Sequence, residues 1–337
     1  MILRRMSKPT RILRLVSVSD QHLLGGIMNA IADVNLEQLT KPVVQHFFDP
    51  NTWTLTYVVI DPETKRCAIV DPVLDLDYAS GTLNTTSADA VIEFVRSQQL
   101  TVDYIIETHV HADHLTSAPY LKSALGGEIM IGKHISTVQQ TFAQVYNEPS
   151  DFPKNGEQFD LTMADDDRFS VGSLQGRAFH VPGHTPACMA YLIGDALFVG
   201  DTLFMPDGGT ARCDFPGGDA ATLFRSIKRL LDLPSETRMF VCHDYQPNGR
   251  ELAWETTVGA QREANIHVHN GVSEAEFVAM REARDATLKM PTLILPSLQV
   301  NMRAGHLPPV DADGRLFLRV PLNVFGGDNM ADLAADQ

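Results

Sequence analysis

From about residue 45 onward, short apolar runs alternate with stretches of helical periodicity. The runs at 53–60 and 66–70 flank turn-forming residues at 62–65, a pattern that predicts a β-hairpin. Further short apolar runs predict strands at 104–107, 128–131, 178–181, 189–193, 196–199 and 238–242.

Helical segments are predicted between these strands. Ser87 is expected to cap a helix whose apolar positions lie between 91 and 95. Asp219 is expected to cap a second helix, with the apolar residues between 223 and 230 on one face. A third helix is expected at 274–288, followed by proline-punctuated extended segments up to the C-terminus.

Strands that alternate with helices predict stacked sheets covered by helices, an α/β class of fold. No internal repeat or Pro/Gly/Ser-rich linker divides the chain. We therefore expect one domain over residues 28–337, with a C-terminal extension from about residue 266.

The first 27 residues differ from the rest in charge. They hold five basic residues against the single acid Asp20, which is typical of an organelle transit peptide. A disordered tail, or an upstream start codon with Met28 as the true first residue, is the favoured alternative. We expect a cytoplasmic protein, with organelle targeting by residues 1–27 as the competing interpretation.

Composition excludes several classes of protein. With 27 basic and 42 acidic residues, the formal net charge is −15, which argues against a nucleic-acid partner. No apolar run approaches the roughly 18 residues of a membrane span. Four cysteines in 337 residues are too few for a disulfide scaffold, and Cys188 and Cys213 are expected to be small core residues rather than persulfide carriers.

Three histidines and one aspartate lie within six residues, directly after a predicted strand. They are His109, His111, Asp113 and His114. A turn at the strand end could direct several of them at one point, and imidazole with carboxylate suits zinc, iron or manganese. Taken alone, Asp113 could instead cap a helix running over 115–125.

Three more candidates follow predicted strands in the same way, namely His184, Asp201 and His243. Singly, each has an ordinary explanation: Asp201 could form a turn, and a lone histidine is usually structural. Together they repeat the strand-end position of the cluster at 109–114. Strand ends meet at one edge of a sheet, where α/β proteins commonly place their sites, so we expect one metal centre.

These motifs resemble those of the metallo-β-lactamase superfamily over roughly residues 45–265. The matching features are His-x-His-x-Asp-His at 109–114, Gly-His-Thr at 183–185, Gly-Asp-Thr-Leu-Phe at 200–204 and His-Asp at 243–244. The resemblance implies a four-layer αββα sandwich. It also implies a first metal site of His109, His111 and His184, and a second of Asp113, His114 and His243, bridged by Asp201.

Within this superfamily, the chain most resembles the persulfide dioxygenases and a bacterial subgroup of β-lactamase-hydrolase-like proteins. The shared segments are 108–117, 212–215, 243–245 and 301–303, although Cys213 stands where threonine is usual. The resemblance implies one Fe(II) per chain on His109, His184 and Asp201, with the other four ligand positions as an outer shell. The substrates would be glutathione persulfide and O2, and the expected glutathione contacts are Arg212, Asp214, Tyr245, Asn301 and Arg303.

Other functions share the same motifs. The main alternative is a Zn(II)-dependent thioester hydrolase of the glyoxalase II type, acting on acyl-glutathione. Lactone or β-lactam hydrolysis needs the fold but not the glutathione-type loop, and a non-catalytic binding protein would retain the pocket without turnover. A homodimer is the default expectation for the assembly.

Overall fold

The computed structural model describes residues 41–326, so the predicted extension at 1–27 and the expected domain start at 28 lie outside the described residues. The first six-stranded sheet has the order β1-β2-β3-β6-β8-β9, with bounds Val43–Asp49, Thr54–Ile60, Arg66–Val70, Thr101–Ile106, Glu128–Gly132 and Leu161–Met163. The second has the order β10-β11-β12-β13-β14-β15, with bounds Arg168–Val171, Leu174–His180, Met189–Ile193, Ala196–Phe198, Arg238–Phe240 and Glu255–Thr257. A small third sheet has the order β5-β4-β7, with bounds Thr82–Asn84, Val73–Asp77 and Leu115–Thr116.

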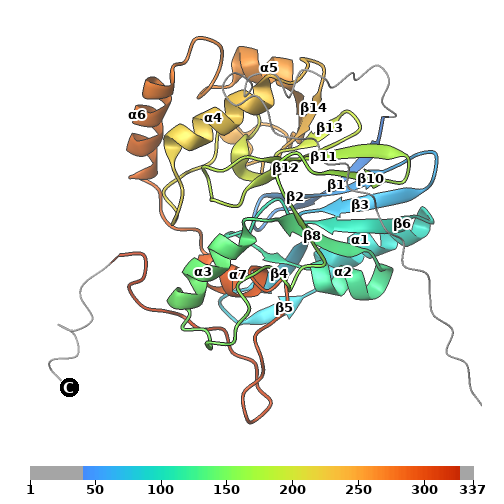
Figure 1. Cartoon of the computed structure of the whole chain (residues 1–337), viewed down its shortest axis with the longest axis vertical. Helices are drawn as coiled ribbons and strands as arrows, with labels where there is room; N and C mark the ends of the chain where they lie inside the picture. Colours follow the sequence, from blue (N-terminus) through green and yellow to red (C-terminus); the bar gives the residue numbers. More distant parts are fainter. Residues whose placement is uncertain (1–40, 327–337) are drawn as a thin grey trace, which may run out of the picture.

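Helices cover the outer face of each large sheet (Figure 1). The first sheet packs against α1, α2, α3 and α7, which span Thr86–Ser97, Ala118–Leu125, Ile135–Val145 and Ile294–Asn301. The second packs against α4, α5 and α6, which span Ala220–Leu231, Val258–Ala264 and Glu274–Asp285. The four layers are those of the expected αββα sandwich, which is confirmed.

Strand β2 shows why the sheets stack. All seven of its residues are buried, as expected for a strand covered on both faces. Leu55, Tyr57 and Val59 point into the core between the two sheets. Val58 and Ile60 point to the opposite side, into the core beneath the helices. The period-2 alternation of side chains therefore lets one buried strand contribute to two apolar layers.

Most predicted elements are confirmed within a few residues. The hairpin over 53–70 is present as β2 and β3, and Asp219 caps α4 by accepting a hydrogen bond from the backbone N–H of Thr222. The predicted cap at Ser87 is wrong, and the alternative in which Asp113 caps a helix over 115–125 does not hold. Ser87 lies inside α1 and bonds to Asp75, and Asp113 lies five residues before the start of α2, where it faces the candidate site instead.

The prediction of only extended segments after α6 is also wrong, because Ile294–Asn301 forms the helix α7. Pro296 misled the prediction. It is the third residue of the helix, where a backbone N–H has no intrahelical partner, so proline costs no hydrogen bond there. Tertiary packing then favours the helix, since Ile294, Leu298 and Met302 enter the core beneath the first sheet.

The C-terminal extension packs onto the sandwich. Helix α6 begins with a capping box formed by Ser273 and Glu276. Its Phe277 is fully buried, and the centroids of the Phe277 and Phe224 rings lie 5.4 Å apart, which joins α6 to α4. Between residues 41 and 326, no helix combines the length and hydrophobicity needed to cross a membrane.

We predict that the extension unfolds together with the sandwich. Phe277→Ala should lower the free energy of unfolding by about 3–5 kcal/mol through the cavity it leaves, and unfolding should remain a single transition. Denaturant unfolding followed by fluorescence and circular dichroism measures both. Glu282→Ala, at an exposed position of α6, is the control and should change stability little. A separate early transition in Phe277→Ala would show that the extension is an independent unit.

Candidate metal centre

The predicted ligands follow strands whose C-terminal ends lie at one edge of the sandwich. His184 follows β11, Asp201 follows β13 and His243 closely follows β14, and these three strands run in the same direction. The segment 109–114 follows β6 of the other sheet. The two sheets are joined at this edge, because the backbone N–H of Leu55 donates to the carbonyl of Cys242 at 2.8 Å.

The segment 109–114 is shaped by the buried carboxylate of Asp71, which follows β3. Asp71 accepts hydrogen bonds from the backbone N–H and the hydroxyl of Thr108, both at 2.8 Å. It also accepts from Nε2 of His111 at 2.9 Å. Asp71 itself has φ +49°, an uncommon conformation for a residue other than glycine. One carboxylate therefore fixes both the start of the segment and the orientation of a histidine ring.

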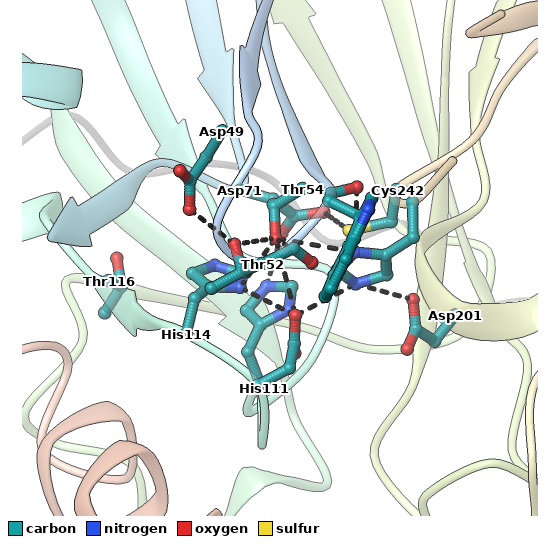
Figure 2. A network of polar contacts seen from close by, with 12 residues as sticks. Asp49, Thr52, Thr54, Asp71, His111, His114, Thr116, Asp201 and Cys242 are labelled. Carbon is teal, nitrogen blue, oxygen red and sulfur yellow. Dashed lines mark hydrogen bonds and ion pairs between the residues drawn. The ribbon is translucent and has the colours of Figure 1, made fainter. Parts of the chain in front are cut away.

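Of the four groups of possible metal-ligand atoms among the described residues, two consist entirely of predicted ligands. One atom from each of His109, His184 and Asp201 lies within 4.8 Å of the others, which brings together the predicted iron ligands. His111, Asp113 and His114 form a second such group. His243 connects the two, since its Nε2 lies 3.3 Å from an oxygen of Asp113 and 3.3 Å from an oxygen of Asp201. Figure 2 shows His111 and His114 with their rings next to one another, below Asp71 and Cys242.

Three histidines of the centre direct Nδ1 to a hydrogen-bond partner outside the ligand cluster. Nδ1 of His184 donates to the carbonyl of Arg212 at 2.7 Å, and Nδ1 of His243 donates to the carbonyl of Trp53 at 3.3 Å. Nδ1 of His109 donates to the Thr108 hydroxyl, at 3.0 Å. These bonds fix the tautomers, so that the other nitrogen of each ring presents a lone pair, as in metal-binding histidines.

Four ring nitrogens and one carboxylate oxygen of the predicted ligands are buried and have no hydrogen-bond partner within the described part of the chain. They are Nε2 of His109, His114 and His243, Nδ1 of His111 and Oδ1 of Asp201. Buried polar atoms without partners are rare and cost free energy. A cation would satisfy all of them at once, and imidazole with carboxylate suits iron, zinc or manganese. The residues therefore fit a metal centre.

The pKa shifts of two predicted ligands, His109 and Asp113, fit metal binding. Burial, together with the neighbouring imidazoles of His111 and His184, holds the pKa of His109 well below its usual value, so its ring is neutral. Burial opposes ionisation of Asp113, but the imidazoles of His243 and His114 hold the pKa of its carboxyl well below its usual range. Neutral imidazole and ionised carboxylate are the forms that bind metals.

A cleft of about 930 Å³ opens onto the centre. The predicted ligands Asp113, His114, His184 and Asp201 lie in its wall, as do the predicted substrate contacts Arg212 and Tyr245. Tyr245 is half exposed and stacks on His243 with 5.8 Å between ring centroids. The cleft thus brings the metal ligands and two of the expected glutathione contacts to one space.

The other three predicted substrate contacts are not among the residues that line this cleft. Asp214 forms a two-bond ion pair with Arg212, at 2.6 Å for each bond. Asn301 is buried, and its amide bonds to the backbone of the metal-binding segment. Arg303 pairs with Glu148 and lies over the ring of Phe152. As substrate contacts these three stay predictions, and the geometry gives each of them a partner inside the protein.

Sequence analysis missed three residues that support the centre. Asp71 follows a strand directly, so the strand-end rule that singled out Asp201 could have found it. Thr54 lies within 3.4 Å of ring nitrogens of both His114 and His243. Glu107, buried beside His111, accepts a hydrogen bond from Thr116. No local pattern marks Thr54 or Glu107, because their partners lie on other elements.

Comparison with known proteins agrees with this geometry. The model of the metallo-beta-lactamase superfamily matches residues 54–243. A probable metallo-hydrolase of Burkholderia pseudomallei is 51% identical over 83% of this chain and 99% of its own length. A beta-lactamase hydrolase-like protein of Xylella fastidiosa is 52% identical over 88% of this chain and 69% of its own length. The human mitochondrial persulfide dioxygenase ETHE1 is 29% identical over 79% of this chain and 90% of its own length.

A solved structure has the same architecture. The crystal structure of ETHE1 from Myxococcus xanthus matches 78% of this chain and all of its own, with a TM-score of 0.62 and 29% sequence identity. Its agreement in fold adds to the family model, which spans more than half of the chain and all seven predicted ligand positions. The chain therefore belongs to the metallo-beta-lactamase superfamily and is an enzyme of that superfamily.

Proposed function

We propose that this enzyme is an iron-dependent persulfide dioxygenase that oxidises glutathione persulfide with O2. The observation that carries the proposal is the convergence of His109, His184 and Asp201 on one point, with His184 and Asp201 in the wall of the cleft. Two histidines and one carboxylate are the ligand set of non-haem iron oxygenases, because they leave positions open for two co-substrates. The likeness to ETHE1 supports the same assignment.

The charges in the cleft suit glutathione, which carries two carboxylates and one ammonium group. Arg212, Arg284 and Lys289 bring cations into the lining, and Asp75 and Asp77 bring carboxylates. Arg212 is held in place by Asp214 and by the carbonyl of Lys289 at 2.6 Å. A guanidinium fixed in this way can bind a carboxylate with little further loss of side-chain entropy.

The residues of the chain would have the following roles in this reaction. His109, His184 and Asp201 would hold a ferrous ion, which would supply the chemistry that lets O2 react with a sulfur anion. Arg212 and Tyr245 hold the peptide part of the substrate, so that its terminal sulfur points toward the ligand cluster. Phe204 and Phe215 also line the cleft and limit the access of water. Overall, one persulfide, one O2 and one water give one glutathione and one sulfite.

A second candidate is a two-metal thioester hydrolase, favoured by the free nitrogens of His114 and His243 beside Asp113. In that case all seven ligand positions hold metal, and the centre activates water for attack on an acyl-glutathione. The likeness to the probable metallo-hydrolase supports this alternative.

We predict oxygen uptake by the iron-loaded protein. Anaerobically purified protein should consume O2 when glutathione persulfide is added, with sulfite formed in equal amount, and an oxygen electrode with a sulfite assay measures both. The zinc-loaded protein is the control and should consume no oxygen. No uptake by protein of confirmed iron content, combined with release of glutathione from an acyl-glutathione thioester, would favour the hydrolase.

Two isosteric variants separate a one-metal from a two-metal centre. Asp201→Asn should lower the affinity for iron and the turnover by about 100-fold or more, because it replaces a charged carboxylate ligand with a neutral amide. Asp113→Asn should cost no more than the roughly 10–100-fold that is typical of residues that support ligands, and it should retain one iron per chain. Metal analysis after dialysis, together with kcat, checks both. Loss of a second equivalent of metal in Asp113→Asn would contradict the one-iron centre.

A further inference from the structure

The end of helix α7 touches the metal-binding segment through one side chain. Asn301 is 3% exposed. Its Nδ2 donates to the carbonyl of His111 at 2.9 Å and to the carbonyl of His114 at 2.8 Å. Its Oδ1 accepts from the backbone N–H of Thr116 at 2.9 Å. Both amide hydrogens and one oxygen lone pair are thus committed to the backbone between 111 and 116.

That stretch of backbone needs such a partner. Residues 109–114 carry four of the seven predicted ligands, yet they form no helix or strand whose hydrogen bonds would fix them. Buried carbonyls outside regular structure must find donors elsewhere. For His111 and His114, the side chain of Asn301 is such a donor. Asp71 fixes the beginning of the segment, and Asn301 fixes its end.

We propose that Asn301 is a positioning residue of the metal centre. By holding the backbone of His111, His114 and Thr116, it sets the direction of the imidazoles that this segment presents to the metal. Asn301 lies in the C-terminal extension, 58 residues beyond the last residue matched by the superfamily model. The extension therefore forms part of the metal-binding apparatus, and its effect reaches the metal through the backbone rather than by direct ligation.

The same helix offers a matched control in Gln299, which is 1% exposed. Its Nε2 donates to the carbonyls of Leu295 and Arg319, at 3.0 and 2.6 Å. Its Oε1 accepts from the backbone N–H of Arg319 at 2.8 Å. Gln299 thus makes the same number and kind of bonds as Asn301, but to segments that carry no predicted ligand.

The test compares Asn301→Asp with Gln299→Glu. Each change replaces two amide donors by an oxygen that faces two carbonyls, so both should lower the melting temperature. Only Asn301→Asp should weaken metal binding, by about 10–100-fold as for other residues that orient ligands. The metal affinity of Gln299→Glu should stay within about 2-fold of that of the wild type, because its partners carry no predicted ligand. Chelator competition on the apoprotein with Fe(II), and separately with Zn(II), measures affinity without any assay of turnover.

A milder variant keeps the test decisive if Asn301→Asp fails to fold. Asn301→Ser retains a hydroxyl that can donate to one carbonyl, and it should show a smaller loss of metal affinity. Equal losses of affinity in the Asn301 and Gln299 variants would overturn the proposal, since they would reflect general destabilisation. Wild-type affinity in the Asn301 variants, with a raised KM for glutathione persulfide, would also overturn it and would indicate a substrate contact. Because the readout is metal affinity, the result holds whichever reaction the enzyme catalyses.

Discussion

The centre depends on one constraint: ring nitrogens of four histidines and one oxygen of Asp201 are buried together and form no hydrogen bond within residues 41–326. The orientation of three histidine rings of the centre is fixed because one nitrogen of each ring is hydrogen-bonded elsewhere. Carbonyls of Arg212 and Trp53 and the carboxylate of Asp71 accept these hydrogen bonds. Without these acceptors the rings could turn and satisfy one another. The surrounding hydrogen bonds thus orient these atoms so that a bound cation could contact several of them at once.

The fold provides this arrangement by joining two sheets at the edge where their parallel strands end. Ligands come from turns after β6, β11, β13 and β14, and the bond from Leu55 to Cys242 keeps the two edges together. The extension after residue 266 adds two further contacts, one to helix α4 and one to the metal-binding segment. Phe277 fixes α6 to α4, and Asn301 reaches from α7 to the backbone of the metal-binding segment.

The thiols of Cys188 and Cys213 are poorly suited to act as nucleophiles or metal ligands. Burial raises the pKa of Cys188 and of Cys213 to about 12, so both are protonated at neutral pH. A protonated thiol is a poor nucleophile and a poor metal ligand. Under the proposed function, the reacting sulfur would therefore belong to a bound substrate. The two cysteines lie in the core as small buried residues, in line with the expectation from sequence. Arg212, Arg284 and Lys289 in the cleft lining bring the charge that such a substrate would meet.

From the sequence alone, eight of the fifteen described strands, the stacking of sheets beneath helices and the seven candidate ligands at one edge could be predicted. This was possible because strand periodicity is local, and because each ligand directly or closely follows a strand whose end lies at a common edge. Tertiary structure decided the parts that depend on distant partners. Pro296 suggested extended chain until packing beneath the first sheet favoured α7. Asn301 resembled a substrate contact in its motif, yet its amide meets carbonyls nearly 190 residues away in sequence. Hydrogen bonds of that separation exist only once the chain has folded, so no pattern of neighbouring residues records them.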